Sequence, residues 1–334
     1  MEETKELMRR NRWHFSHLGL MFFLGTLAIW LVQTAVSALA ERFRPEWLKS
    51  GDISLTVSMV ALYLIGMPIL ILLVKRVPAV KIEKKSMKVW QFLLAVVMCF
   101  CIMYCSNFFG LIVTFIVGLF KGGQVNNVLM DVTSQTGLLT RFAYMVICAP
   151  IMEEFIFRKL IVDRTVRYGQ GVAILVSGLM FGLFHGNLNQ FAYAFVLGMF
   201  LAFLYAKTGK IQYTIGIHMV VNFVGSIIAT SIIEAMNYTA YMEAVASGAG
   251  VEELSELIMA SLPGWIAYLG LMAFMGLTIV GGIVLFVVFR KRFALEKGEI
   301  VLPKGQRFTT VWLNVGMVLF TVYWLYRIVE QLLA

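Results

Sequence analysis

Long apolar runs separated by short basic segments are the feature that most constrains this chain. A helix that crosses a bilayer needs about 20 consecutive, mostly apolar residues. Hydrophobic residues make up 60% of the 334-residue sequence, against about 45–50% in soluble domains. We therefore expect an all-α polytopic membrane protein with about eight or nine transmembrane helices. The candidate spans are 18–40, 54–74, 89–118, 138–161, 171–187, 188–206, 211–233, 264–289 and 309–330.

The basic residues determine the expected orientation. The net charge of +9 is compatible with a nucleic-acid partner, but the lysines and arginines cluster between apolar runs and no nucleic-acid-binding motif occurs. We therefore expect no nucleic-acid partner. With the N-terminus in the cytoplasm, 22 of the 28 lysines and arginines fall on the inner side, as the positive-inside rule requires. The short loops favour a bacterial cell membrane, so we expect a multi-pass protein there with a cytoplasmic N-terminus.

Three regions follow from this arrangement. Residues 1–137 are expected to form an N-terminal three-span region, and residues 138–233 a four-helix core. Residues 234–334 are expected to hold an extracytoplasmic interfacial segment and two C-terminal spans. Val251 and Leu254 begin an apolar pattern with helical spacing, which predicts a helix lying on the membrane surface.

Charged residues inside the fourth apolar run require an explanation. Each charge near a bilayer centre costs roughly 2.5–3.5 kcal/mol on the insertion scale. Glu154 and Arg158 are four residues apart, so they share a helix face and can pair. Glu153 is rotated from Glu154 by about 100° on a helix of about 3.6 residues per turn. A solvated ion pair near a helix end is the alternative interpretation of Glu154 and Arg158.

Two histidines lie in apolar runs further along the chain. His185 follows Phe181 by four residues, and His218 precedes Asn222 by four. Ionisable residues inside a membrane are functional candidates by default, although a histidine or asparagine can also serve as a hydrogen-bonding link between helices. Together with the acidic residues of the fourth run, these side chains are suited to line one cavity.

The order of these residues resembles a known family. The segment EEFIFR matches the pattern EExxxR, FGLFH matches FxxxH, and HMVVN matches HxxxN. Together they resemble the CAAX-protease and bacteriocin-processing (CPBP, or Abi) family of intramembrane endopeptidases. The resemblance covers roughly residues 138–230. The first three spans and the last two have no counterpart in it.

The resemblance implies peptide-bond hydrolysis in a central intramembrane cavity. Glu153 would activate water as a general base, and His185 would help to position or polarise that water. His218 and Asn222 would stabilise the oxyanion. Such roles agree with the physical chemistry, because donors in a low-dielectric site stabilise a developing negative charge more than they would in water.

The resemblance also implies supporting residues and a class of substrate. Glu154 and Arg158 would hold the cavity together, with Phe181 as a further supporting residue. The substrate would be a peptide or the membrane-proximal part of a protein, reached from the lipid bilayer.

Zinc is the alternative to a metal-free reaction. Glu153, His185 and His218 could bind zinc with an open coordination position, which would make the chain a metalloprotease. No HExxH motif occurs, so the two histidines would have to come from different helices. We favour a site without a cofactor.

Two other classes of function compete with a protease. The first is a non-catalytic membrane immunity or regulatory protein of the same fold. Every motif position is intact, which argues against this class. The second is a proton-coupled transporter that uses Glu153 and His185 as a relay. The sequence lacks the repeat between halves that many transporters show.

Overall fold

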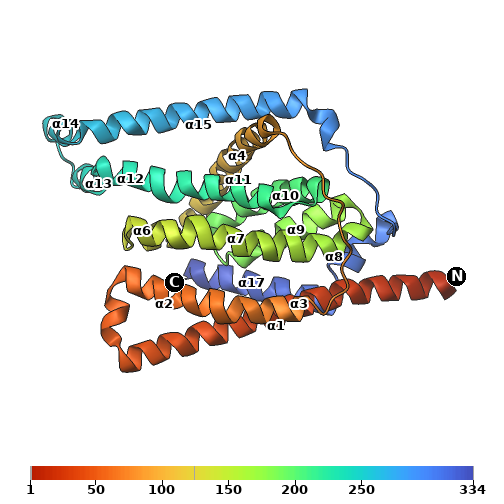
Figure 1. Ribbon diagram of the computed structural model, residues 1–334. Coiled ribbons are helices and arrows are strands. Elements are labelled where there is room, and N and C mark those ends of the chain that lie inside the picture. The colour runs from red at the N-terminus through yellow and green to blue at the C-terminus, as the bar shows by residue number, and fades with distance from the viewer. Residues whose placement is uncertain (1, 124, 334) are drawn as a thin grey trace.

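The computed structural model describes residues 2–123 and 125–333, and every regular element in these ranges is a helix (Figure 1). The expected all-α class is therefore confirmed. The α-helices are α1 (Glu2–Phe43), α2 (Gly51–Ala61), α3 (Met67–Val74), α4 (Val89–Lys121), α5 (Val128–Ser134), α6 (Leu138–Arg141), α7 (Ala149–Glu153), α8 (Ile161–Thr165), α9 (Gln170–Phe184), α10 (Leu188–Thr208), α11 (Ile211–Phe223), α12 (Thr230–Ala235), α13 (Tyr238–Ala246), α14 (Val251–Ala260), α15 (Leu262–Val288), α16 (Arg307–Val311) and α17 (Val315–Leu333). The π-helical turns are η2 (Leu62–Gly66), η3 (Phe142–Cys148), η4 (Glu154–Leu160) and η6 (Val224–Ala229), and the 3₁₀ turns are η1 (Pro45–Lys49), η5 (Val166–Tyr168), η7 (Arg290–Phe293) and η8 (Lys304–Gln306).

Within the described ranges, six helices are long and apolar enough to cross a membrane. A seventh span results if α16 and α17, which meet at a bend of 65°, are counted as one. The chain is therefore polytopic, as expected. The expected count of eight or nine includes two helices that do not meet these criteria. The continuous helix from α6 to α8 carries several charges, and α9 has only 15 residues.

The basic connections gather at one end of the bundle. The connection after α3 lies there, because the amide of Val80 donates to the carbonyl oxygen of Asp163 at 2.7 Å. The connection after α15 lies there too, because the amide of Ile300 donates to the carbonyl oxygen of Arg167 at 3.0 Å. The first turns of α1 are at this same end, and α13 and α14 are at the other (Figure 1). The segments expected on the cytoplasmic side thus share one end, and the compartment that this end faces stays a prediction.

Helices α9 and α10 approach each other closely at two glycines. A Cβ atom on Gly178 would lie 2.9 Å from the backbone nitrogen of Met199, and one on Gly198 would lie 2.9 Å from Cδ1 of Phe181. The ring of Phe181 therefore occupies space that a side chain at position 198 would fill. Helices α1, α3 and α17 complete the core around α9, so residues from all three expected regions share it; they include Phe22, Leu70, Met317 and Phe320.

Candidate active site

The helix from α6 to α8 carries the buried ion pair of the site. The side chains of Glu154 and Arg158 are each 0% exposed, and Nε of Arg158 lies 3.0 Å from Oε2 of Glu154. This burial shows that the alternative interpretation, a solvated ion pair near a helix end, is wrong. Arg158 is one of the 22 basic residues counted above on the inner side, and its burial removes it from that count.

Helix α9 supplies further contacts to the buried guanidinium group. Nη1 of Arg158 donates to Oγ of Ser177 at 3.3 Å, and that hydroxyl donates to the carbonyl oxygen of Phe157 at 2.7 Å. The guanidinium carbon lies 4.5 Å from the centre of the Phe181 ring. Arginine stacks favourably on an aromatic face, particularly where water is excluded. Arg158 therefore connects the helix from α6 to α8 with α9.

His218 on α11 lies between the two glutamates. Its Nδ1 is 2.9 Å from Oε1 of Glu154, and its Nε2 is 3.7 Å from Oε2 of Glu153. An ionised carboxylate can only accept a hydrogen bond, so Nδ1 carries the hydrogen in its contact with Glu154. This contact fixes the orientation of the imidazole ring and directs Nε2 towards Glu153.

Phe181 and His185 lie at the end of α9. The ring of Phe181 is 4.8 Å from that of His185 and 5.9 Å from that of His218, measured between ring centres. Nδ1 of His185 donates to the carbonyl oxygen of Phe181 at 2.8 Å, which leaves Nε2 as the nitrogen available for another contact. The chain then turns at Gly186, whose φ of +63° is accessible to glycine without strain.

Asn222 on α11 donates through Nδ2 to the backbone carbonyl oxygen of Met145, at 2.8 Å. This carbonyl lacks a partner in its own helix for a local reason. The π-helical turn before α7 pairs the amide of Ala149 with the carbonyl oxygen of Tyr144. The next residue, Pro150, has no N–H to donate to Met145. The proline thus leaves an acceptor that orients the amide of Asn222.

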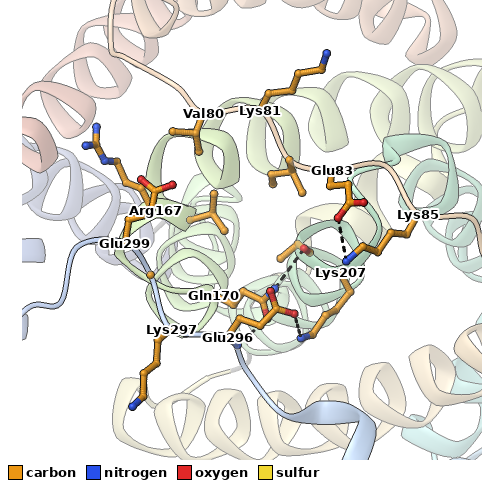
Figure 2. Close-up of a pocket in the computed structure, with 14 residues that line it drawn as sticks. Val80, Lys81, Glu83, Lys85, Arg167, Gln170, Lys207, Glu296, Lys297 and Glu299 are labelled. Atoms are coloured by element: carbon orange, nitrogen blue, oxygen red, sulfur yellow. Dashed lines mark hydrogen bonds and ion pairs between the residues drawn. The ribbon is translucent and has the colours of Figure 1, made fainter.

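The two adjacent glutamates differ in accessibility. The side chain of Glu153 is 21% exposed, whereas that of Glu154 is 0% exposed. Two pockets at the basic end of the bundle, one of them drawn in Figure 2, include none of the predicted site residues. Neither pocket corresponds to the expected central cavity. The accessible carboxylate of Glu153 is therefore the feature that distinguishes the candidate site.

The predicted zinc ligands can be compared with these contacts. Nδ1 of His185 and Nδ1 of His218 are both engaged by protein acceptors, so only Nε2 of each is available. Among the described residues, no group of three or more His, Cys, Asp or Glu side chains has an arrangement that could hold a metal ion. As arranged here, Glu153 and the two histidines do not fit a three-ligand zinc site.

Three parts of this arrangement were not predicted from the sequence. They are the hydroxyl of Ser177, the contact of Glu154 with His218, and the carbonyl that Pro150 leaves free. A signal for the last was present, because a proline inside a transmembrane helix always removes a backbone donor. No comparable signal in the sequence indicates the contact between Glu154 and His218, since it joins two different helices.

This part of the chain is similar to known proteins. Residues 135–224 match the family described as Type II CAAX prenyl endopeptidase Rce1-like, and all seven predicted site residues lie in that range. A protein of Bacillus subtilis (strain 168) named "Putative membrane peptidase YdiL" is 28% identical over 127 residues. This match covers 37% of the chain and 50% of the relative, so it spans about half the length of that protein. No solved structure matches the chain significantly.

Proposed function

Since residues 135–224 match the family described as Type II CAAX prenyl endopeptidase Rce1-like, we propose that the chain is an intramembrane endopeptidase. It hydrolyses a peptide bond in a peptide or in the membrane-proximal part of a protein. The observation that best supports this proposal is the position of His218, with one ring nitrogen 2.9 Å from the buried Glu154 and the other 3.7 Å from the accessible Glu153.

In the proposed first step, Glu153 removes a proton from a water molecule as the water oxygen attacks the substrate carbonyl carbon. Glu153 suits this role because its side chain is partly exposed and its contact with His218 is too long for a strong hydrogen bond. Its carboxylate therefore keeps capacity to accept a proton. Nε2 of His185 helps to orient the attacking water.

His218 and Asn222 stabilise the negative charge that develops on the carbonyl oxygen. The second hydrogen on Nδ2 of Asn222 is free to donate, because only one is used by Met145. His218 donates through Nε2 when that nitrogen is protonated, and the carboxylates of Glu153 and Glu154 balance the resulting positive charge. Donors held in position before the reaction stabilise an oxyanion without the reorganisation that water requires.

In the last step, the carbon–nitrogen bond breaks and protonated Glu153 delivers its proton to the leaving nitrogen. The immediate products are a carboxylic acid and an amine, and Glu153 returns to its ionised form; the acid then passes its proton to the amine or to water, which gives a carboxylate. The buried pair of Glu154 and Arg158 takes no proton in this scheme. It holds His218 and the Phe181 ring in place.

Cleavage assays with the full chain in lipid nanodiscs test the proposal. Quenched fluorescent peptides, with and without a C-terminal isoprenyl group, would be incubated with wild type, Glu153→Gln and the distant control Glu46→Gln. We expect cleavage by wild type and the control, and a loss of at least ~100-fold in Glu153→Gln, typical of removing acid–base catalysis. Mass spectrometry of the products identifies the bond that is cut.

Two results would count against the proposal. Equal cleavage by wild type and Glu153→Gln would remove Glu153 from the reaction. A folded wild-type protein that cleaves neither peptide class, nor any peptide in a membrane-protein digest, would favour the non-catalytic regulatory alternative.

A further inference from the structure

A second pocket lies at the basic end of the bundle, beside the first turns of α1. It has a volume of about 660 Å³ and forms where α1 meets the connections after α3, α8 and α15. It is separate from the candidate active site, because it includes none of that site's residues. The lining residues are Leu7, Arg9, Arg10, Asn11, Trp13, His14, Pro78, Arg167, Tyr168 and Ile300.

The charges of this pocket are not balanced. Arg9, Arg10 and Arg167 line it, and no acidic side chain does. Among the side chains that the structure describes, which do not include those of residues 1–4, none pairs ionically with these three arginines. Like charges gathered around one cavity repel each other, so an anion in the pocket would lower the electrostatic energy.

The neighbouring pocket, which is drawn in Figure 2, differs from the α1 pocket in how its charges are paired. It is also lined by basic residues and shares Arg167 with the α1 pocket, but Lys207 pairs there with Glu296 at 2.9 Å and Lys85 pairs with Glu83 at 3.2 Å (Figure 2). Its charges are therefore largely compensated within the protein. A general excess of basic residues at this end of the bundle does not explain why only the α1 pocket lacks carboxylates.

Unused hydrogen-bond donors occur at the α1 pocket. Asn11 is 4% exposed, and its Oδ1 accepts from the hydroxyl of Tyr168 at 3.4 Å. Its Nδ2 has no partner among the described residues, and neither has the buried Nε of Arg167. Buried polar groups are normally hydrogen-bonded. Both unused groups are enclosed donors on residues that line the pocket, so an acceptor that reaches them from the pocket would satisfy them.

The position of the pocket relative to the bilayer indicates the kind of anion. Leu7 and Trp13 line it and are 48% and 62% exposed. The apolar span of α1 follows directly, and tryptophan is enriched where a transmembrane helix meets the headgroup region. We propose that the α1 pocket binds the phosphate group of an anionic amphiphile, with the guanidinium groups on the phosphate and Trp13 beside its apolar part.

Titration of the protein with an anionic lipid in nanodiscs tests this site. Full-length protein would be titrated with fluorescent phosphatidylglycerol in phosphatidylcholine nanodiscs at about 0.15 M salt, where distant surface charges are screened. The variants are Arg10→Gln with Arg167→Gln, and the control is Lys291→Gln with Arg292→Gln, two exposed positions at the same end outside both pockets. We expect about 25-fold weaker lipid binding in the pocket variant, at about fivefold per charge. The control should change less than twofold.

The phosphate group could belong to a membrane lipid or to a soluble phosphate compound. Competition with inorganic phosphate and with glycerol phosphate distinguishes these two sources. Displacement of the lipid at millimolar concentration assigns the site to a soluble phosphate, and resistance to displacement assigns it to a membrane lipid. Equal weakening in the pocket and control variants would overturn the proposal, because binding would then be a general surface attraction. If Arg167→Gln prevents folding, Arg9→Gln with Arg10→Gln tests the same pocket, since both side chains are exposed.

Discussion

The side-chain amide of Asn222 on α11 donates to the backbone carbonyl oxygen of Met145 in the helix from α6 to α8, at 2.8 Å. Only the amide nitrogen can meet a carbonyl oxygen, so this bond also fixes which way the amide faces. The carbonyl is available because residue 150 is a proline. A backbone detail of one helix thereby determines the orientation of a proposed oxyanion donor on another.

Pro150→Ala is expected to raise stability and lower activity together. Alanine is favoured over proline inside a helix by about 3 kcal/mol, so thermal unfolding should shift upward. The new N–H at position 150 would compete for the Met145 carbonyl and release Asn222. We expect kcat to fall about tenfold with KM nearly unchanged, which is the pattern for an interaction made in the transition state.

Pro68→Ala is the matched control for that variant. In the helix that contains α3, the amide of Met67 bonds to the carbonyl oxygen of Leu62, so Pro68 follows a π-helical turn in the same way. Its replacement should raise the unfolding temperature and leave kcat within about twofold. If Pro150→Ala also raises stability without lowering kcat, Pro150 has no role in positioning Asn222.

Arg158→Ala should reduce stability as well as activity. The change leaves the carboxylate of Glu154 buried without its cationic partner, and breaking a buried pair typically costs about 3–5 kcal/mol. Denaturant titration in detergent micelles, followed by circular dichroism, measures the change. Unaltered stability combined with lost activity would instead indicate that Arg158 contacts the substrate.

A metal-free reaction predicts that active protein contains no bound metal and that chelators do not inhibit it. Elemental analysis of active protein should find well under one metal ion per chain, and a strong chelator should leave turnover unchanged. His218→Ala and Asn222→Ala should each lower turnover by about 10²–10³, as loss of an oxyanion donor does. Stoichiometric zinc that leaves with activity and restores it on return would show instead that a metal is required.

Fusions to alkaline phosphatase test the orientation of the chain. This reporter needs disulfides and is active only outside the cytoplasm. A fusion after residue 250, in the connection between α13 and α14, should be active. A fusion after residue 300, at the opposite end of the bundle (Figure 1), should be silent. The reverse pattern would place the basic end outside and contradict the positive-inside assignment.

Contacts within a helix were predictable, because spacing on a helix determines which side chains share a face. Glu154 and Arg158 pair as their spacing predicts, even though their segment is π-helical. The helical class also followed from the apolar runs alone.

The sequence by itself determined that this chain is a helical membrane protein and which residues are candidates for chemistry, because hydropathy and helical spacing are local properties. Only the tertiary structure decided that Glu154 contacts His218 and that Glu153 is the accessible glutamate. The same is true of Asn222, whose partner lies 77 residues away along the chain. Such contacts depend on how far each helix is rotated and how closely it approaches its neighbour. Those quantities are set by packing at places such as Gly178 and Gly198, which no local pattern encodes.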